Sequence, residues 1–186
     1  MLKGVKLIDP DTVFINHDTE FGRDVVIHPN VVFGQNVIID SLVQIKSFSH
    51  LEECKIKSGS SIGPFARIRG DSILGNNSKV GNFVEIKKSN LSENVKINHL
   101  SYVGDSEIGS STNIGAGTII CNYDGKNKNK TKIGKNSFVG SNSTIIAPIK
   151  IGENVTMGAG SIFNKDIPNN TLAIGRAYQI NKKKKS

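Results

Sequence analysis

The sequence predicts an all-β protein, a parallel β-helix built of hexapeptide repeats, and three observations support this fold class. An aliphatic or aromatic residue returns at six-residue steps, glycine often follows it, and one polar insertion interrupts the series. A six-residue period matches neither the 3.6-residue period of an α-helix nor the two-residue alternation of an isolated strand. It matches short strands separated by turns, three to a triangular coil, with coils stacked about 4.8 Å apart.

The repeated residues hold their phase from Phe21 to Phe163, which a β-sandwich of short strands does not explain. A few steps are shortened to five residues, and the series then resumes. Three rungs to a coil give about eight coils. The positions expected to point inward are Phe21, Ile27, Phe33, Ile39, Ile45, Leu51, Ile56, Ile62, Ile68, Leu74, Val80, Ile86, Leu91, Ile97, Val103, Ile108, Ile114, Ile120, Ile133, Val139, Ile145, Ile151, Met157 and Phe163.

The repeat also divides the chain. Residues 1–20 precede it and are expected to be an N-terminal lead-in, and residues 21–176 form the predicted β-helix domain. Residues 121–132 are polar, basic and glycine-containing, and are expected to protrude as a loop. A long loop on a regular scaffold often carries function, although it can also be a tolerated insertion. Residues 177–186 form a short, basic C-terminal tail that is expected to be disordered.

Composition narrows the classes of partner. The formal net charge of +8, from 24 Lys and Arg against 16 Asp and Glu, favours an anionic partner. The aromatic residues do not alternate with basic ones, so small phosphorylated ligands fit better than nucleic acid. There is no apolar run near the roughly 20 residues of a membrane helix and no signal-peptide pattern, so a cytoplasmic protein without membrane insertion is expected. Cys54 and Cys121 are too few for a disulfide framework or a metal cluster.

Aligning the coils places one histidine in a column of small residues. Two positions after the inward residue of one face, consecutive coils carry Asn82, His99, Ala116, Ser141 and Ala159. The small side chains should leave backbone N–H and C=O groups accessible to a ligand in a groove. His99 is therefore a candidate general base, although a lone histidine is more often structural. None of the four histidines forms a spaced pair like that of a zinc site, so no metal is expected.

Two cations are predicted to stack on the next face. Arg69 and Lys87 each follow the inward residue of adjacent coils. Cations about 5 Å apart repel each other unless an anion lies between them. A phosphate group suits the pair, with the arginine as a fork and the lysine as a point charge. Two solvated surface cations are an equally open interpretation.

Five segments carry a resemblance to a known family. They resemble the C-terminal acetyltransferase domain of the bacterial bifunctional N-acetylglucosamine-1-phosphate uridyltransferase/glucosamine-1-phosphate N-acetyltransferase, within the hexapeptide-repeat acyltransferases. The resemblance covers essentially the whole chain and implies a left-handed β-helix, a handedness that general rules for crossover connections would not predict. The segments are residues 63–67, 81–88, 99–105, 113–118 and 121–125.

The resemblance implies acetyl transfer from acetyl-CoA to the amine of glucosamine-1-phosphate, a step towards UDP-N-acetylglucosamine for peptidoglycan and lipopolysaccharide precursors. It implies a homotrimer with active sites at subunit boundaries, and His99 as the general base. The implied glucosamine-1-phosphate contacts are Arg69, Lys87, Tyr102, Asn113, Asn122 and Lys128. The implied acetyl-CoA contacts are Ala116, Ser141, Ala159 and Arg176.

The sequence departs from this family in one large respect. The uridyltransferase half, with its glycine-rich nucleotide loop and magnesium-binding carboxylates, has no counterpart here, so uridyl transfer by these 186 residues is not expected. The chain is then either a piece of a longer protein or one of two separate enzymes. Neither cysteine lies in the histidine column, which favours direct attack over a covalent acyl-enzyme. The alternatives are a hexapeptide acyltransferase with another amine or hydroxyl acceptor, and a non-catalytic β-helix scaffold.

Overall fold

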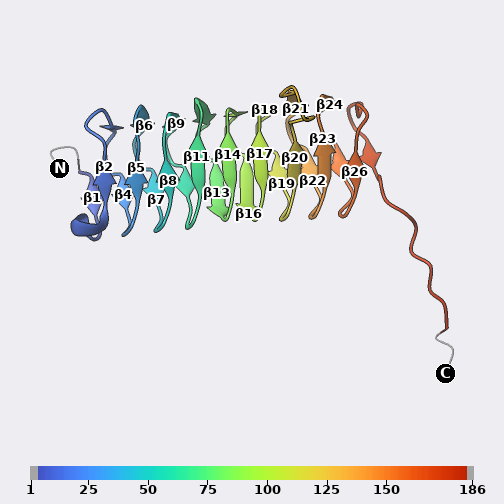
Figure 1. The fold of residues 1–186 in the computed structure, drawn as a ribbon, viewed down its shortest axis with the longest axis horizontal. Helices are drawn as coiled ribbons and strands as arrows, with labels where there is room; N and C mark the ends of the chain where they lie inside the picture. The colour runs from blue at the N-terminus through green and yellow to red at the C-terminus, as the bar shows by residue number, and fades with distance from the viewer. Residues whose placement is uncertain (1–3, 184–186) are drawn as a thin grey trace.

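A computed structural model describes residues 4–183, most of which wind into one long solenoid, with the first and last described residues at opposite ends of its axis (Figure 1). Within these residues, 27 short strands lie in three parallel sheets of ten, nine and eight strands, here called sheets A, B and C. The predicted fold class, an all-β parallel helix of short repeated strands, is confirmed. The solenoid has about nine turns rather than the predicted eight.

Each turn contributes one strand to each sheet. Sheet A contains β1 (Lys6–Leu7), β4 (Val26–Ile27), β7 (Gln44–Ile45), β10 (Ser61–Ile62), β13 (Lys79–Asn82), β16 (Lys96–His99), β19 (Asn113–Ile114), β22 (Phe138–Val139), β25 (Thr156–Met157) and β27 (Leu172–Ala173). Sheet B contains β2 (Phe14–Ile15), β5 (Val32–Phe33), β8 (His50–Leu51), β11 (Arg67–Arg69), β14 (Glu85–Lys87), β17 (Tyr102–Gly104), β20 (Ile119–Cys121), β23 (Thr144–Ile146) and β26 (Ile162–Phe163). Sheet C contains β3 (Glu20–Phe21), β6 (Val37–Ile39), β9 (Cys54–Ile56), β12 (Ser72–Leu74), β15 (Asn90–Leu91), β18 (Ser106–Ile108), β21 (Thr131–Ile133) and β24 (Ile149–Ile151).

The repeated aliphatic residues fill the interior. In one coil Ile62, Ile68 and Leu74 mark the three sides, and all three are fully buried. The parallel register sets each of them directly beside the inward residue of the next coil. Burying one such side chain contributes about 1.5–3 kcal/mol, so the interior stabilises the solenoid and leaves the outward positions available for function.

The additional turn lies before Phe21, in residues predicted to be a lead-in. β1 pairs with β4 and β2 pairs with β5, so both belong to the solenoid. The 3-10 helix η1 (Pro10–Thr12) lies between β1 and β2. It lengthens the step between Leu7 and Ile15, which pair with the inward residues Ile27 and Phe33, beyond six residues, because it adds chain between them. This break in phase is why the repeat pattern misses the first turn.

The C-terminal segment leaves the solenoid after β27 and runs away from it (Figure 1). Residues 177–183 contain no strand or helix, and the remainder of the predicted tail, residues 184–186, lies outside the described residues. Within residues 4–183 no helix has the length and apolar character needed to cross a membrane.

Candidate functional site

His99 lies at the corner where sheet A meets sheet B, at the end of β16. It is the direct neighbour of Asn82 across the β13–β16 ladder. Its ring atom Nδ1 lies 2.7 Å from Oδ1 of Asn82. An amide oxygen can only accept a hydrogen bond, so this contact places the imidazole proton on Nδ1. Nε2 then carries a lone pair and faces away from the contact, as a general base requires.

The backbone around His99 is anchored to the coils on both sides. The N–H of Leu100 donates to the carbonyl of Asn82 at 3.0 Å, and the N–H of Gly117 donates to the carbonyl of His99 at 3.2 Å. The buried Ser101 hydroxyl also donates to the His99 carbonyl, at 2.8 Å. The corner is therefore rigid, and the freedom that remains to His99 is rotation of its exposed side chain.

The small-residue column above His99 presents backbone donors rather than both kinds of backbone group. The carbonyls of Ala116 and Ser141 accept hydrogen bonds from the coil above, at 2.7 and 2.8 Å, so they are already used. Among the backbone hydrogen bonds of the described residues, none is donated by the N–H of Ala116, Ser141 or Ala159. The prediction named both N–H and C=O groups; the two carbonyls each already accept one hydrogen bond, whereas the three N–H groups donate none within the backbone ladder of the described residues. The column offers an N–H at each coil level to a ligand with acceptor groups.

Arg176 lies at the far end of this column. The coil of β25 carries Gly160 at the corner, and a Cβ built on Gly160 would lie 3.8 Å from Cδ of Arg176. The arginine side chain is thus one coil beyond Ala159, on the same edge. Its position is consistent with a charged end to the column, while its contact with acetyl-CoA stays a prediction.

Arg69 and Lys87 are direct neighbours in the β11–β14 ladder, as the coil alignment predicts. The predicted need for an external anion is corrected for Arg69, because Nε of Arg69 lies 2.7 Å from Oε1 of Glu85. Both side chains of this pair are about two-thirds buried, with 28% and 30% exposed. The carboxylate fixes one edge of the guanidinium and leaves its other N–H donors for a ligand.

The inserted residues 121–132 fold as a small hairpin between β20 and β21. Tyr123 and Lys128 form an antiparallel bridge. At the tip, the carboxylate of Asp124 accepts a hydrogen bond from the N–H of Asn127 at 2.7 Å. This and further backbone donors at the tip lower the pKa of Asp124 to about 2. The hairpin is held by its own hydrogen bonds, so it presents Lys128 from a defined direction.

Lys128 contacts Lys87. This contact is the main cause that lowers the pKa of Lys87, followed by desolvation and by the charges of Lys128 and Arg69, while the Asp105 carboxylate acts in the opposite direction. Three cations from two strands and the hairpin therefore converge on one place at the edge of sheet B. A phosphate group bound there would relieve their mutual repulsion.

Tyr102 and Asn122 meet over a glycine beside this cluster. A Cβ at Gly104 would lie 2.5 Å from the Tyr102 hydroxyl and 2.8 Å from Nδ2 of Asn122. Only glycine leaves room for both groups. Asn122 is buried and donates to the buried carboxylate of Asp105, so it secures the base of the hairpin. Its contact with a sugar stays a prediction.

Asn113 is not brought to the cluster. It lies on β19 of sheet A, in register with Lys96 and Phe138, whereas Arg69, Lys87 and Tyr102 lie on sheet B. Within one chain, the predicted substrate contact Asn113 therefore lies on a different sheet from Arg69, Lys87 and Tyr102. A second copy could bring its Asn113 to the cluster, and this separation is the structural reason to consider one.

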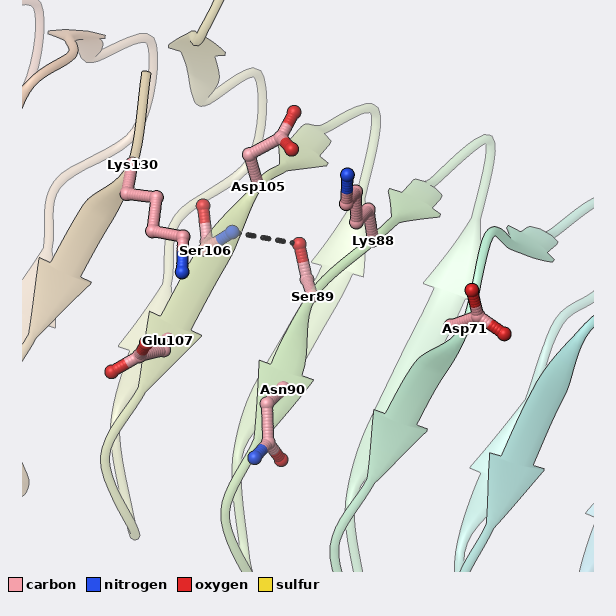
Figure 2. Close-up of a pocket in the computed structure, with 8 residues that line it drawn as sticks. All are labelled: Asp71, Lys88, Ser89, Asn90, Asp105, Ser106, Glu107 and Lys130. Atoms are coloured by element: carbon pink, nitrogen blue, oxygen red, sulfur yellow. Dashed lines mark hydrogen bonds between the residues drawn. The ribbon is translucent and has the colours of Figure 1, made fainter. Parts of the chain in front are cut away.

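Several hollows formed by the described residues lie away from the predicted site residues. One of about 180 Å³ lies at the corner between sheets B and C, where Ser106 N–H donates to Ser89 Oγ at 3.0 Å (Figure 2). Figure 2 shows side chains of both charge signs around it, among them Lys130 and Glu107. Its lining contains none of the predicted site residues.

Three features of the region are absent from the sequence prediction. Glu85 pairs with Arg69, and Asp105 pairs with Asn122. The third is a stacked row of exposed side chains, here called the aromatic ridge: Phe48, Phe65, Phe83 and Leu100. The coil alignment that places His99 would also have found the ridge, since all four residues follow the inward residue by three positions. Within residues 4–183 no group of three His, Cys, Asp or Glu residues could hold a metal ion.

Comparisons with known proteins agree with this arrangement. A family model described as bacterial transferase hexapeptide (six repeats) matches residues 53–88 and 130–165. The bifunctional protein GlmU of Anaplasma marginale (strain Florida) is 53% identical over 179 residues, 96% of this chain and 42% of the relative. GlmU of Wolbachia pipientis wMel is 52% identical over 180 residues, 97% of this chain and 42% of the relative. The chain thus spans less than half the length of these relatives, and the resemblance inferred from its motifs is confirmed.

Solved structures support the fold alone. The UDP-N-acetylglucosamine acyltransferase from Campylobacter jejuni superposes with a TM-score of 0.78 at 19% identity, over 87% of this chain and 68% of the other. LpxA, a UDP-N-acetylglucosamine acyltransferase from Bacteroides fragilis 9343, gives a TM-score of 0.66 at 21% identity over 87% of this chain and 69% of the other. The stacked hexapeptide coils are thus shared across a wide range of sequences.

Proposed function

We propose that this chain, which carries bacterial transferase hexapeptide repeats and matches GlmU proteins over nearly its whole length, is a glucosamine-1-phosphate N-acetyltransferase. It would transfer the acetyl group of acetyl-CoA to the amine of glucosamine-1-phosphate, on the way to UDP-N-acetylglucosamine. The observation that carries the proposal is the hydrogen bond between His99 and Asn82, which leaves Nε2 as a base at one end of a column of backbone donors.

The base acts on the amine of the acceptor. Nε2 of His99 takes a proton from the nitrogen as that nitrogen attacks the thioester carbonyl, so a C–N bond forms and a tetrahedral oxyanion develops. When the intermediate collapses, the C–S bond breaks, and the proton held by His99 passes to the departing thiolate. One group thus serves as base and then as acid, and the proton count balances within the step.

Ala116 is positioned to stabilise the oxyanion. It lies one coil beyond His99, about 4.8 Å along the axis. Its N–H is not used in the backbone ladder of the described residues. A donor fixed before the reaction costs no reorganisation when charge develops, and the loss of one such donor typically reduces kcat by about 10²–10³-fold.

The cation cluster supports a phosphorylated acceptor. Arg69, Lys87 and Lys128 converge beside Tyr102, and the hairpin places its lysine with little flexibility. A phosphate dianion would bind there through charge-assisted hydrogen bonds. Plain glucosamine would gain none of these contacts, so the proposal requires a large preference for the 1-phosphate.

The donor column supports coenzyme A as the acyl carrier. Its pantetheine arm is narrow and carries two amide carbonyls, which match the N–H groups of Ser141 and Ala159 on successive coils. Arg176, beyond them, suits the phosphates of the coenzyme. The thioester would then lie between Ala116 and His99.

We also propose a homotrimer, with another copy completing each site. The aromatic ridge supports this, because Phe48 and Phe65 stack at 4.8 Å and Phe65 and Phe83 at 5.1 Å, yet the rings are about half exposed. All three adopt φ between 55° and 61°, a region costly for bulky residues. Covering these exposed rings with a second copy would remove apolar surface from water, which favours an interface there. Sedimentation at micromolar concentration should give three copies, and a fully active monomer would contradict the assembly.

Acceptor specificity tests the function. The protein is mixed with acetyl-CoA and, in separate reactions, glucosamine-1-phosphate, glucosamine, glucosamine-6-phosphate and a UDP-sugar hydroxyl acceptor, and free thiol is followed with a chromogenic disulfide. Glucosamine-1-phosphate should give the highest kcat/KM and a product heavier by one acetyl group. A higher kcat/KM for a hydroxyl acceptor would support a different hexapeptide acyltransferase. If no acceptor produced thiol release, the result would support a non-catalytic β-helix scaffold instead.

A further inference from the structure

The contact between Asn82 and His99 determines which nitrogen of the imidazole can act. We propose that Asn82 is a positioning residue that holds His99 in the tautomer protonated on Nδ1, and so leaves Nε2 free to accept the proton of the acceptor amine. This inference rests on the proposed function, because it assigns a role within the same site.

The two side chains are held in register by the fold. β13 and β16 are four residues long, whereas most strands have two or three, and they end at Asn82 and His99. The ladder pairs these two residues directly. Their backbones are further joined by the hydrogen bond from Leu100 N–H to the Asn82 carbonyl. The sheet thus fixes the backbone positions of the two residues, and the side-chain hydrogen bond between them orients the ring.

Asn82 is the hydrogen-bond partner that the described residues offer to the His99 ring. The ring is exposed, while Asn82 is half-buried in the corner below it. In water an imidazole exchanges freely between its two tautomers, and the one protonated on Nε2 cannot act as a base at that atom. A fixed acceptor at Nδ1 removes this unproductive form.

The choice of an amide has a chemical consequence. A carboxylate at this position would also accept from Nδ1, but its charge would favour the protonated imidazolium. The amide oxygen fixes the tautomer without adding a charge. The opposite amide orientation, with Nδ2 donating to Nδ1, would place the ring proton on Nε2 and block the base.

The direct test is the ¹⁵N spectrum of the histidine ring nitrogens in the intact protein, with His99 assigned by its absence from His99→Gln. In the neutral ring, Nδ1 of His99 should show the shift of a protonated nitrogen and Nε2 that of an unprotonated one. In Asn82→Ala the two shifts should move towards each other, as tautomers mix. A protonated Nε2 in the unaltered protein would overturn the proposal without any variant.

Kinetics separate positioning from folding. Asn82→Ala should lower kcat about tenfold, the size expected from one hydrogen bond, with KM for both substrates unchanged. Asn82→Asp, which restores an acceptor, should recover the Nδ1-protonated signature. Asn164→Ala, at an exposed asparagine directly after β26, should change neither. An unchanged spectrum in Asn82→Ala would overturn the role of Asn82 even if acetyl transfer is confirmed. Loss of the proposed function would instead appear as no turnover in the unaltered protein, whatever the spectrum shows.

Discussion

Replacing Gly81 with alanine should separate the two coils that carry Asn82 and His99. A Cβ built on Gly81 would overlap the carbonyl oxygen of Asn98 and lie 2.7 and 2.9 Å from its carbonyl carbon and Cα. All three atoms are backbone atoms of β16, so none can rotate away. Gly81 does not have a positive φ, so the substitution alone would otherwise stabilise the protein by about 0.4–1 kcal/mol.

Overpacking outweighs this gain. Extra atoms in a close-packed interior typically cost about 1–3 kcal/mol. The overlap is with backbone atoms that cannot move aside, so the cost should lie in the upper part of this range, and subtracting the gain leaves a net loss of about 1–2.6 kcal/mol. For a chain of this size each kcal/mol shifts Tm by about 2–4 °C, so Gly81→Ala should lower Tm by roughly 2–10 °C. A separation of about 1 Å would also stretch the 2.7 Å contact beyond hydrogen-bond length, so kcat should fall in the fraction that remains folded.

Differential scanning calorimetry and thiol-release kinetics below Tm measure the two effects. The matched control is Gly158→Ala, which occupies the same place four coils on, after the inward Met157. There the nearest atom to a new Cβ is Cγ1 of the exposed Ile174 side chain, at 3.3 Å, which can move. Gly158→Ala should leave Tm unchanged or slightly raised. An equal Tm for Gly81→Ala and the unaltered protein would refute this account of coil packing at the histidine.

Three further predictions concern the ligand sites and the cysteines. Arg69→Ala and Lys87→Ala should each raise KM for glucosamine-1-phosphate about 10- to 100-fold and leave KM for acetyl-CoA nearly unchanged; an unchanged KM for the phosphate ester counts against the cation cluster. Ala159→Leu should raise KM for acetyl-CoA about 10- to 200-fold, while Thr156→Leu on the same coil should not; equal effects would place the coenzyme elsewhere. Burial raises the pKa of Cys54 to about 12, so alkylation should modify Cys121 rapidly and Cys54 only on unfolding, and two fast thiols would contradict the buried position.

The sequence predicts the solenoid well because one physical rule is repeated. Each inward aliphatic residue fixes a strand and its neighbours, so the register of Ile62 against Val80 follows from counting, as does that of Arg69 against Lys87. The pattern does not detect the first turn of the solenoid, because η1 adds residues between two of its strands. The six-residue spacing is what the sequence shows. A short helix inserted between two strands breaks that spacing, although the solenoid continues through it.

Side-chain pairing in the site is harder to predict. Counting places Asn82 beside His99, but it does not show that the amide oxygen faces Nδ1. Likewise, it stacks Arg69 on Lys87 without showing that Glu85 turns towards the guanidinium. Such contacts depend on rotamers and charge, which the period of the chain does not encode. The hairpin lies outside the hexapeptide repeat. Its conformation, which brings Lys128 to Lys87, depends on hydrogen bonds at its own tip and cannot be obtained by counting residues.

The pH dependence of kcat in His99→Ala tests the central claim most directly. Thiol release from acetyl-CoA with saturating glucosamine-1-phosphate is measured from pH 6 to 8 for the unaltered protein, His99→Ala and the control His28→Ala, with circular dichroism to confirm that each variant is folded. Loss of a general base should lower kcat of His99→Ala by roughly 10²–10⁴-fold and leave His28→Ala unaffected. A folded His99→Ala protein that keeps the kcat of the unaltered enzyme across this range would contradict the proposed mechanism.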